Sequence, residues 1–155
     1  LFDVDLPDRC YQESAQVEAG ETPLVVQLDD WRLGVSICYD LRFPELYRHY
    51  SAQGCTLLSI PSAFTVPTGQ AHWEVLLRAR AIENQAYVLA PAQIGSHPGG
   101  RQTYGHSMII DPWGEIIAQA SNQSDVAGEL IVAEIELNIV HEIRNKMPAL
   151  RHGNL

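Results

Sequence analysis

Short apolar runs alternate with amphipathic segments along this chain, and that order predicts an α/β fold. Apolar runs rich in Val, Ile and Leu that end at turn residues are typical of strands. Apolar residues that recur every three or four positions are typical of helices. We expect strands at 23–28, 31–37, 56–60, 87–90, 106–110, 115–118 and 129–135, and helices at 43–53, at 71–85 and from Asn138 onward. Strands that alternate with helices and then form hairpins indicate an α/β fold with a mixed sheet.

Turn residues separate these elements and leave one structural unit. Asp29 and Asp30 join two strands as a hairpin, Gly54 ends a helix, and residues 111–114 form a second hairpin turn. Residues 1–21 and 95–101 are predicted to be loops because they hold proline, glycine and polar residues without periodicity. No internal repeat or linker interrupts the chain, so we expect a single domain over residues 1–155.

Composition narrows the class of protein. A chain of 155 residues with 46% apolar and 19% charged residues is typical of one globular domain. It contains no apolar stretch near the ~20 residues that span a bilayer. The net charge of −9 argues against nucleic acid as a partner, because phosphates repel an acidic surface. Three cysteines without a CxxC spacing indicate a reducing compartment, so we expect a cytoplasmic protein.

Cys38 is the most informative residue of the chain. It follows the apolar run of residues 33–37 and precedes Pro44 and Glu45, which favour a helix start. A thiol at a turn from strand to helix lies near backbone N–H groups that stabilise a thiolate, and such thiols serve as nucleophiles. The alternative is a small buried cysteine with a packing role.

Three segments resemble the nitrilase superfamily, the carbon–nitrogen hydrolases. They are GVSICYDLRFPE at 34–45, HWEVLLRARAIEN at 72–84 and YGHSMIIDPWG at 104–114. They occur in the family's order, and the resemblance extends from Leu1 to about Asn154. Within the family, the chain most resembles the branch of deaminated-glutathione amidases and ω-amidases. The resemblance implies an α–β–β–α sandwich with mixed sheets, a small linear amide as substrate, no cofactor, and a homodimer in the whole protein.

The resemblance also implies roles for individual residues. Cys38 attacks the amide and forms a thioester, and Glu74 supports the reaction. The position of Tyr39 at the strand-to-helix turn makes its backbone N–H a candidate oxyanion donor. Arg78, one helical turn from Glu74, is expected to hold that carboxylate ionised. Arg42 fixes the turn after Cys38 through buried hydrogen bonds. For Glu74 the alternative is a helix-start carboxylate that pairs with Arg78, and for Arg42 it is a surface pair with Glu45. Asp40 is expected to cap a helix rather than to catalyse.

Arg101 is a candidate partner for a substrate carboxylate, in an amide such as deaminated glutathione or another α-keto acid amide. The alternative is a solvated arginine in a loop.

One departure from the family pattern is plain. The family also uses a Glu and a Lys that precede the cysteine, whereas the only lysine here is Lys146. We therefore expect the amino-terminal part of the domain to be missing and this chain to be inactive by itself. We also expect an uncovered sheet face formed by Val25, Leu28, Val35, Ile37, Leu58 and Ile60.

Two alternatives to an amidase remain open. In the first, the chain is a catalytically inactive fragment that acts at most as a binding module. In the second, it is a thiol hydrolase that uses a Cys–His pair. None of the six histidines lies in a phrase that would pair it with Cys38. No residues show metal-ligand or phosphate-loop spacing, so we expect no metal and no phosphate site.

Overall fold

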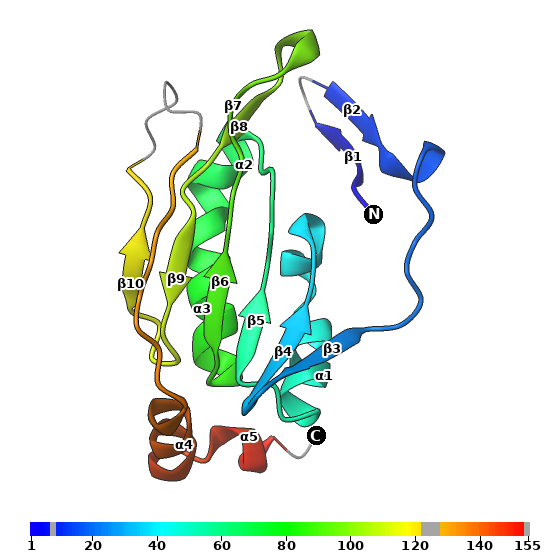
Figure 1. The fold of residues 1–155 in the computed structure, drawn as a ribbon. Helices are drawn as coiled ribbons and strands as arrows, with labels where there is room; N and C mark the ends of the chain where they lie inside the picture. Colours follow the sequence, from blue (N-terminus) through cyan, green and yellow to red (C-terminus); the bar gives the residue numbers. More distant parts are fainter. Residues whose placement is uncertain (7–8, 122–127, 154–155) are drawn as a thin grey trace.

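The computed structural model describes residues 1–6, 9–121 and 128–153. Its centre is a six-stranded mixed sheet with the order β10-β9-β6-β5-β4-β3 (Figure 1). The strands are β3 (Leu24–Leu28), β4 (Trp31–Val35), β5 (Leu57–Ser59), β6 (Tyr87–Ala90), β9 (Met108–Ile110) and β10 (Ile116–Gln119). β4, β5 and β6 run parallel to one another, and the outer pairings are antiparallel. The predicted mixed α/β sheet is therefore confirmed.

Two helices cover one face of this sheet. They are α1 (Pro44–Ala52) and α3 (Glu74–Asn84), and both were predicted: α1 from the residues at its ends and α3 from the helical spacing of its apolar residues. Pro44 occupies the first position of α1, and Gly54 ends the segment with a φ of +78°. Alternate strand residues point to these helices and form the main core, with Leu58, Val88 and Ile110 all at most 1% exposed.

The turn into α3 differs from the prediction. The short helix α2 (Val66–Thr68) and a π-helical turn (Gly69–Trp73) precede α3, where the sequence indicated one helix from residue 71. Gly69 is packed so tightly that a Cβ would lie 2.3 Å from the Tyr104 ring. This close approach explains why a residue without a side chain occupies position 69.

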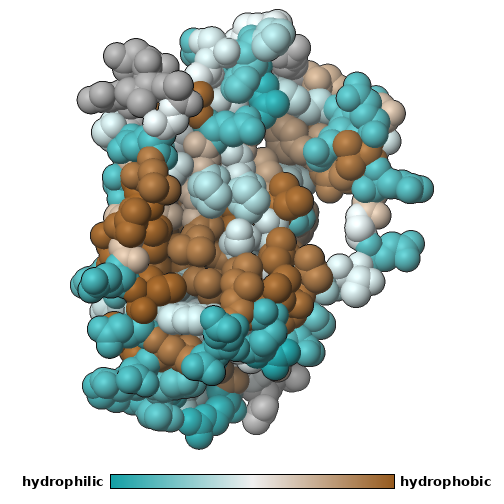
Figure 2. All heavy atoms as spheres, in the orientation of Figure 1, coloured by the Kyte–Doolittle hydropathy of each residue, from teal (hydrophilic) through white to brown (hydrophobic). Residues whose placement is uncertain are grey.

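The opposite face of the sheet is largely apolar and only partly covered (Figure 2). The helix α4 (Leu137–Lys146) packs Val140 against Leu57 and Tyr87 on this face, and the short helix α5 (Ala149–His152) follows. Leu24 and Leu28 on β3 remain 56% and 45% exposed. We call this surface the open face; it includes Leu24, Leu28, Val35 and Ile117, together with Ile37 just beyond β4.

The predicted membership of the open face was wrong for three residues. Leu58 and Ile60 are buried, and Val25 packs beside them on the side of α1 and α3. The strand register explains this, because Val25 pairs with Gly34 and Gly34 with Leu58, so these positions share the helix-covered face. Leu28 and Ile37 are exposed as predicted.

Two hairpins lie outside the central sheet, the first within the predicted loop 1–21 and the second around the predicted loop 95–101. β1 (Asp3–Leu6) pairs with β2 (Arg9–Gln12), and a short 3₁₀ helix (Glu13–Ala15) follows. β7 (Ile94–Ser96) pairs with β8 (Gln102–Tyr104) across a turn at Pro98–Gly100. β1 alternates polar and apolar residues over only four positions, and β2, β7 and β8 are three or four residues long with few apolar residues, so none of them gives a pattern long enough to indicate a core strand.

The predicted strand at 129–135 is not part of any ladder within the described residues. The segment runs beside β10 in Figure 1, and exposed residues alternate with half-buried ones from Leu130 to Leu137. It therefore has the period of a strand but not the hydrogen-bonded neighbour that defines one.

No helix in the described ranges is long and apolar enough to cross a membrane.

Candidate active site

Cys38 lies at a sharp turn from β4 into a 3₁₀ helix (Cys38–Arg42), as the sequence predicted. Its φ is +48°, a left-handed conformation that residues other than glycine rarely adopt. The Cys38 N–H donates to Pro61 O at 2.9 Å, and Asp40 accepts a hydrogen bond from the Ile37 N–H at 2.8 Å. These bonds hold the turn in a conformation that presents the partly exposed thiol.

The residues around Cys38 line a cavity of about 1070 Å³. One wall comes from the ends of β4 and β5, including Ser36, Cys38 and Ser62. The other comes from the β1–β2 hairpin and the segment after it, including Tyr11 and Glu13. In Figure 1 this hairpin stands beside the end of β4, and the ring of Phe2 packs edge-on against that of Tyr39 with centroids 5.1 Å apart. The hairpin that the sequence missed therefore forms half of the site.

The 3₁₀ helix after Cys38 also supplies a backbone donor. The Tyr39 N–H is in the first turn, where N–H groups have no carbonyl of the helix to bond. It belongs to the residue directly after Cys38, and backbone N–H groups in such turns serve as oxyanion donors in other hydrolases. Tyr39 itself lines the cavity. The geometry is thus compatible with the role of oxyanion donor expected from its position in the sequence.

Glu74 does not lie with Cys38. It is at the first position of α3, its side chain is 52% exposed, and it does not line the cavity. Its Oε1 is 3.5 Å from Arg78 Nη1, and Arg78 Nε donates to Gly114 O at 2.8 Å. The structure therefore does not bring Glu74 and Arg78 to the thiol, and it shows the alternative of a helix-start ion pair.

Glu13 is the carboxylate that the sequence analysis missed. It lines the cavity with Cys38, and its Oε2 accepts a hydrogen bond from the Phe2 N–H at 2.7 Å. Glu18, Glu21 and Asp40 line the same cavity, but Asp40 is occupied by its bond to Ile37. Glu13 was hidden because the segment around it was predicted to be a loop; the three-residue 3₁₀ helix there has no sequence signature.

Arg42 does not form the predicted buried hydrogen bonds. It lines the cavity, lies over the rings of Tyr39 and Phe64 at 5.8 and 5.3 Å, and contacts His72 Nδ1 at 3.2 Å. No ion pair joins it to Glu45 among the described residues, so the surface-pair alternative is also wrong. Arg42 packs on aromatic rings at the cavity wall.

Arg80 supplies the buried support expected of Arg42. Its Nε and Nη2 donate to Leu41 O at 3.1 and 2.8 Å, and its Nη1 pairs with Glu83 at 2.8 Å. The residue is 5% exposed and lies over the Tyr47 ring. Arg80 thus ties α3 to the helical turn that carries Cys38. Periodicity placed Arg80 on the helix, but no pattern distinguishes a buried arginine from an exposed one.

We expect Arg80→Met to lower the free energy of unfolding by about 2–4 kcal/mol, because it leaves Leu41 O and Glu83 without their partner. Arg78→Met is the matched control on the same helix and should cost about 1 kcal/mol or less, since its ion pair is exposed. Urea unfolding of the two variants measures the difference. Equal losses would contradict the role assigned to Arg80.

No histidine of the described residues lines the cavity. His97 contacts Thr103 Oγ1 at 2.8 Å in the β7–β8 hairpin, and His106 stacks on Tyr104 with centroids 3.7 Å apart. No group of three His, Cys, Asp or Glu residues in the described part of the chain is arranged to hold a metal ion. The candidate bases that line this cavity are therefore carboxylates and not imidazoles.

The sequence matches the carbon–nitrogen hydrolase family model over residues 1–145, so the chain belongs to that family. It is 53% identical over 155 residues to the deaminated glutathione amidase of Synechocystis sp., covering 98% of this chain and 56% of that protein. It is 43% identical over 152 residues to the ω-amidase NIT2 of Xenopus tropicalis, covering 97% and 54%. The chain thus spans about half the length of these curated relatives.

Comparison with solved structures supports the same family. The NitFhit protein of Caenorhabditis elegans matches with a TM-score of 0.90 and 49% identity, covering 99% of this chain and 37% of that one. An amidase from Nesterenkonia, solved as a cysteine-to-alanine mutant in complex with butyramide, matches with a TM-score of 0.70 and 26% identity, covering 95% and 54%. The nitrilase-type fold is confirmed over the length that this chain shares with them.

Proposed function

We propose that these residues form the cysteine-bearing part of an amidase that hydrolyses a small linear amide. The observation that carries the proposal is Cys38, held at φ +48° on a strand-to-helix turn and lining a large cavity. Relatives named deaminated glutathione amidase and ω-amidase support the reaction class. The structure of the Nesterenkonia amidase with acrylamide added to its active-site cysteine supports a thiol as the reacting group.

The proposed reaction has two halves. The Cys38 thiolate attacks the amide carbonyl carbon, and the Tyr39 N–H donates to the oxygen that becomes negative. The C–N bond then breaks, the nitrogen takes a proton, and ammonia or an amine leaves behind a thioester on Cys38. Water attacks the thioester, releases the carboxylic acid and restores the thiol.

We propose Glu13 as the carboxylate that moves protons in this cavity, in place of Glu74. Glu13 lies on the cavity wall and is positioned by the Phe2 N–H, whereas Glu74 pairs with Arg78 outside it. General acid–base groups contribute about 10²–10⁴-fold to rate. Replacing Glu13 should therefore affect the rate of hydrolysis much more than replacing Glu74.

Glu13→Gln should lower kcat by about 10²-fold or more, because a glutamine keeps the shape but carries no exchangeable proton of suitable pKa. Glu74→Gln is the matched control and should leave kcat within about threefold, since it removes only an exposed ion pair worth a few tenths of a kcal/mol. Steady-state ammonia release measures both. A large loss for Glu74→Gln with little change for Glu13→Gln would reverse the assignment.

The activity is proposed for the whole protein, meaning the natural chain that contains these residues at the length of its relatives. The family resemblance calls for a lysine near the thiol, and Lys146 is instead on α4, paired with Glu142 at 2.9 Å. We further propose a homodimer in the cytoplasm; free Cys10, Cys38 and Cys55 support a reducing compartment.

Ammonia release from a panel of small linear amides tests the proposal against its two rivals. The whole protein should hydrolyse at least one amide, and should retain that activity when each of its histidines is replaced by glutamine. Loss of activity on replacing one histidine, with the fold intact, would favour a Cys–His hydrolase. Absence of hydrolysis across the panel would favour an inactive binding module.

A further inference from the structure

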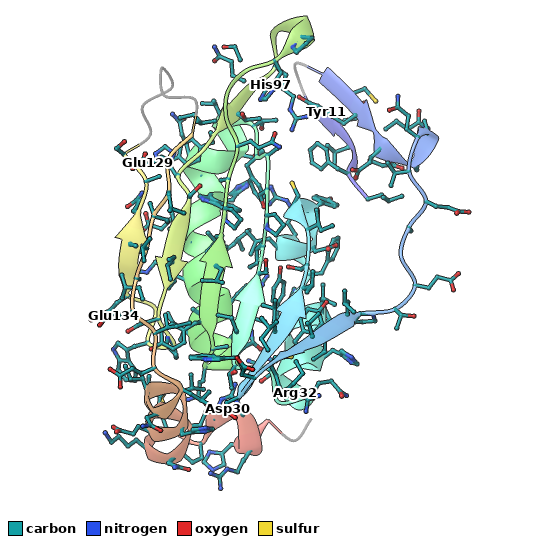
Figure 3. The ribbon with its side chains drawn as sticks, viewed as in Figure 1. Tyr11, Asp30, Arg32, His97, Glu129 and Glu134 are labelled. Carbon is teal, nitrogen blue, oxygen red and sulfur yellow. The ribbon has the colours of Figure 1, made fainter. Side chains whose placement is uncertain are left out.

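Tyr47 lies behind the end of β4 that leads to Cys38. The strand starts beside Asp30 and Arg32, which Figure 3 labels at the lower end of the sheet, and the chain leaves its other end toward the thiol turn. Tyr47 is on α1, one of the two helices that cover the sheet, and its side chain is completely buried. Its hydroxyl lies 2.8 Å from Ser36 Oγ, two residues before Cys38. A polar group of α1 thus contacts the chain just before the thiol turn.

The other hydrogen bonds of Ser36 fix the direction of this contact. Ser36 Oγ donates its one hydrogen to Ser59 O at 3.0 Å, so the Tyr47 hydroxyl is the donor to Ser36 Oγ. The Ser36 N–H also donates to Ser59 O at 3.0 Å, and the Cys38 N–H donates to Pro61 O at 2.9 Å. Burial raises the pKa of the Tyr47 phenol, so the phenol keeps its hydrogen near neutral pH. Tyr47 therefore completes a chain of hydrogen bonds that joins α1 to both strands beside the thiol turn.

The Tyr47 ring supports the chain after Cys38 as well. The guanidinium carbon of Arg80 lies 5.3 Å from the centre of this ring, within the range of a cation–π contact. Arg80 in turn donates two hydrogen bonds to Leu41 O, three residues after Cys38. Tyr47 thus acts on both sides of the thiol turn, on Ser36 directly and on Leu41 through Arg80.

We propose that Tyr47 is a positioning residue for Cys38: its hydroxyl and its ring hold the two sides of the turn, so that the thiol keeps the orientation from which it attacks the amide. This inference rests on the proposed function. Cys38 has a φ of +48°, and such conformations persist only where surrounding contacts hold them. Arg101 lines the cavity, where its Nη2 donates to Ala63 O at 2.6 Å, but Tyr47 does not line it, so its effect on the reaction passes through the turn.

The kinetic test separates positioning from substrate binding. Tyr47→Phe in the whole protein removes the hydroxyl and keeps the ring. It should lower kcat by about 10- to 100-fold and leave KM within about threefold, because a small displacement of a reacting group costs rate rather than binding. Ser36→Ala removes the acceptor of the same bond and should have a similar effect. The double variant should be at most about threefold slower than either single variant, since both changes break one contact.

Tyr87→Phe is the matched control for loss of a buried hydroxyl. Tyr87 is 1% exposed, its hydroxyl accepts a hydrogen bond from the Glu136 N–H at 3.3 Å, and it does not line the cavity. This variant should leave kcat within about twofold. All variants are assayed at a temperature where circular dichroism shows them folded. A folded Tyr47→Phe protein with unchanged kcat, or losses that multiply fully in the double variant, would overturn the inference.

Alkylation tests the same inference without turnover. Iodoacetamide should modify Cys38 about 10-fold more slowly in Tyr47→Phe, because a relaxed turn no longer presents the thiol beside backbone N–H groups. The exposed Cys10 is the reference in the same digest and should react at the same rate in both proteins. Equal alkylation of Cys38 with and without the Tyr47 hydroxyl would contradict the inference. Slower alkylation in a protein that hydrolyses no amide would support it and contradict the proposed function.

Discussion

Replacing Cys38 by alanine in the whole protein should lower amide hydrolysis by at least about 10³-fold. The expected loss is large because a nucleophile that forms a covalent intermediate cannot be replaced by the remaining groups of the site; removal of comparable residues in other hydrolases costs several orders of magnitude. Ammonia release under saturating amide measures it directly. Cys38→Ser should be nearly as inactive, since a hydroxyl is a far weaker nucleophile at neutral pH than a thiol.

The fold should survive this change. Cys38 is only partly buried, and its side chain makes no hydrogen bond that the structure describes. Cys55→Ala, at a cysteine that is 1% exposed, is the matched control: it should lower stability through a small cavity and leave kcat unchanged. A Cys38→Ala protein with ordinary turnover would remove the basis of the proposed mechanism.

The 155-residue chain alone should associate with itself and hydrolyse no amide. Its open face exposes Leu24, Leu28 and Ile37, and contiguous apolar surface of this kind drives association. Size exclusion at increasing concentration should show species larger than the 17.2 kDa monomer. Leu24→Lys should weaken association, whereas Val75→Lys, at an exposed valine on α3 away from the open face, should not.

The same preparation should be inactive because no lysine of the described residues lines its cavity to stabilise the oxyanion. The loss of one such donor typically costs ~10²–10³ in rate, and the hydrogen bond from the Tyr39 N–H would remain the main support. The whole protein, assayed alongside, is the control. A monomer of this chain that hydrolyses amides at the rate of the whole protein would contradict both the role of the open face and the need for a lysine.

The core of the fold was predictable because it follows simple periodicity. β3 and β4 with their Asp29–Asp30 turn, β6 and the helices α1 and α3 all coincide with the predicted segments to within a few residues. The β1–β2 and β7–β8 hairpins were missed because their strands are only three or four residues long, too short for a clear pattern of apolar residues. The predicted strand at 129–135 has the correct period, but pairing depends on a neighbour that periodicity cannot identify.

The site was predictable at Cys38 and less so around it. The strand that ends at Cys38 and the helix start that follows it place the thiol at a turn, and the structure confirms that turn. The residues that hold the Cys38 turn and line its cavity were harder to predict, because they come from segments that are distant in the sequence. Arg80 rather than Arg42 binds the turn, and Glu13 rather than Glu74 lines the cavity. Whether an arginine is buried and where a hairpin packs depend on the tertiary structure, and the local sequence does not reveal either.

The covalent intermediate is the most direct test of the central claim that Cys38 is the nucleophile of an amidase. The whole protein is mixed with an amide substrate, quenched in acid within milliseconds to seconds, digested and analysed by mass spectrometry. We expect a peptide containing Cys38 that is heavier by the acyl group of the substrate, and no such adduct at Cys10 or Cys55. An acyl group found on another residue, or steady hydrolysis by a Cys38→Ala protein without an adduct, would contradict the claim.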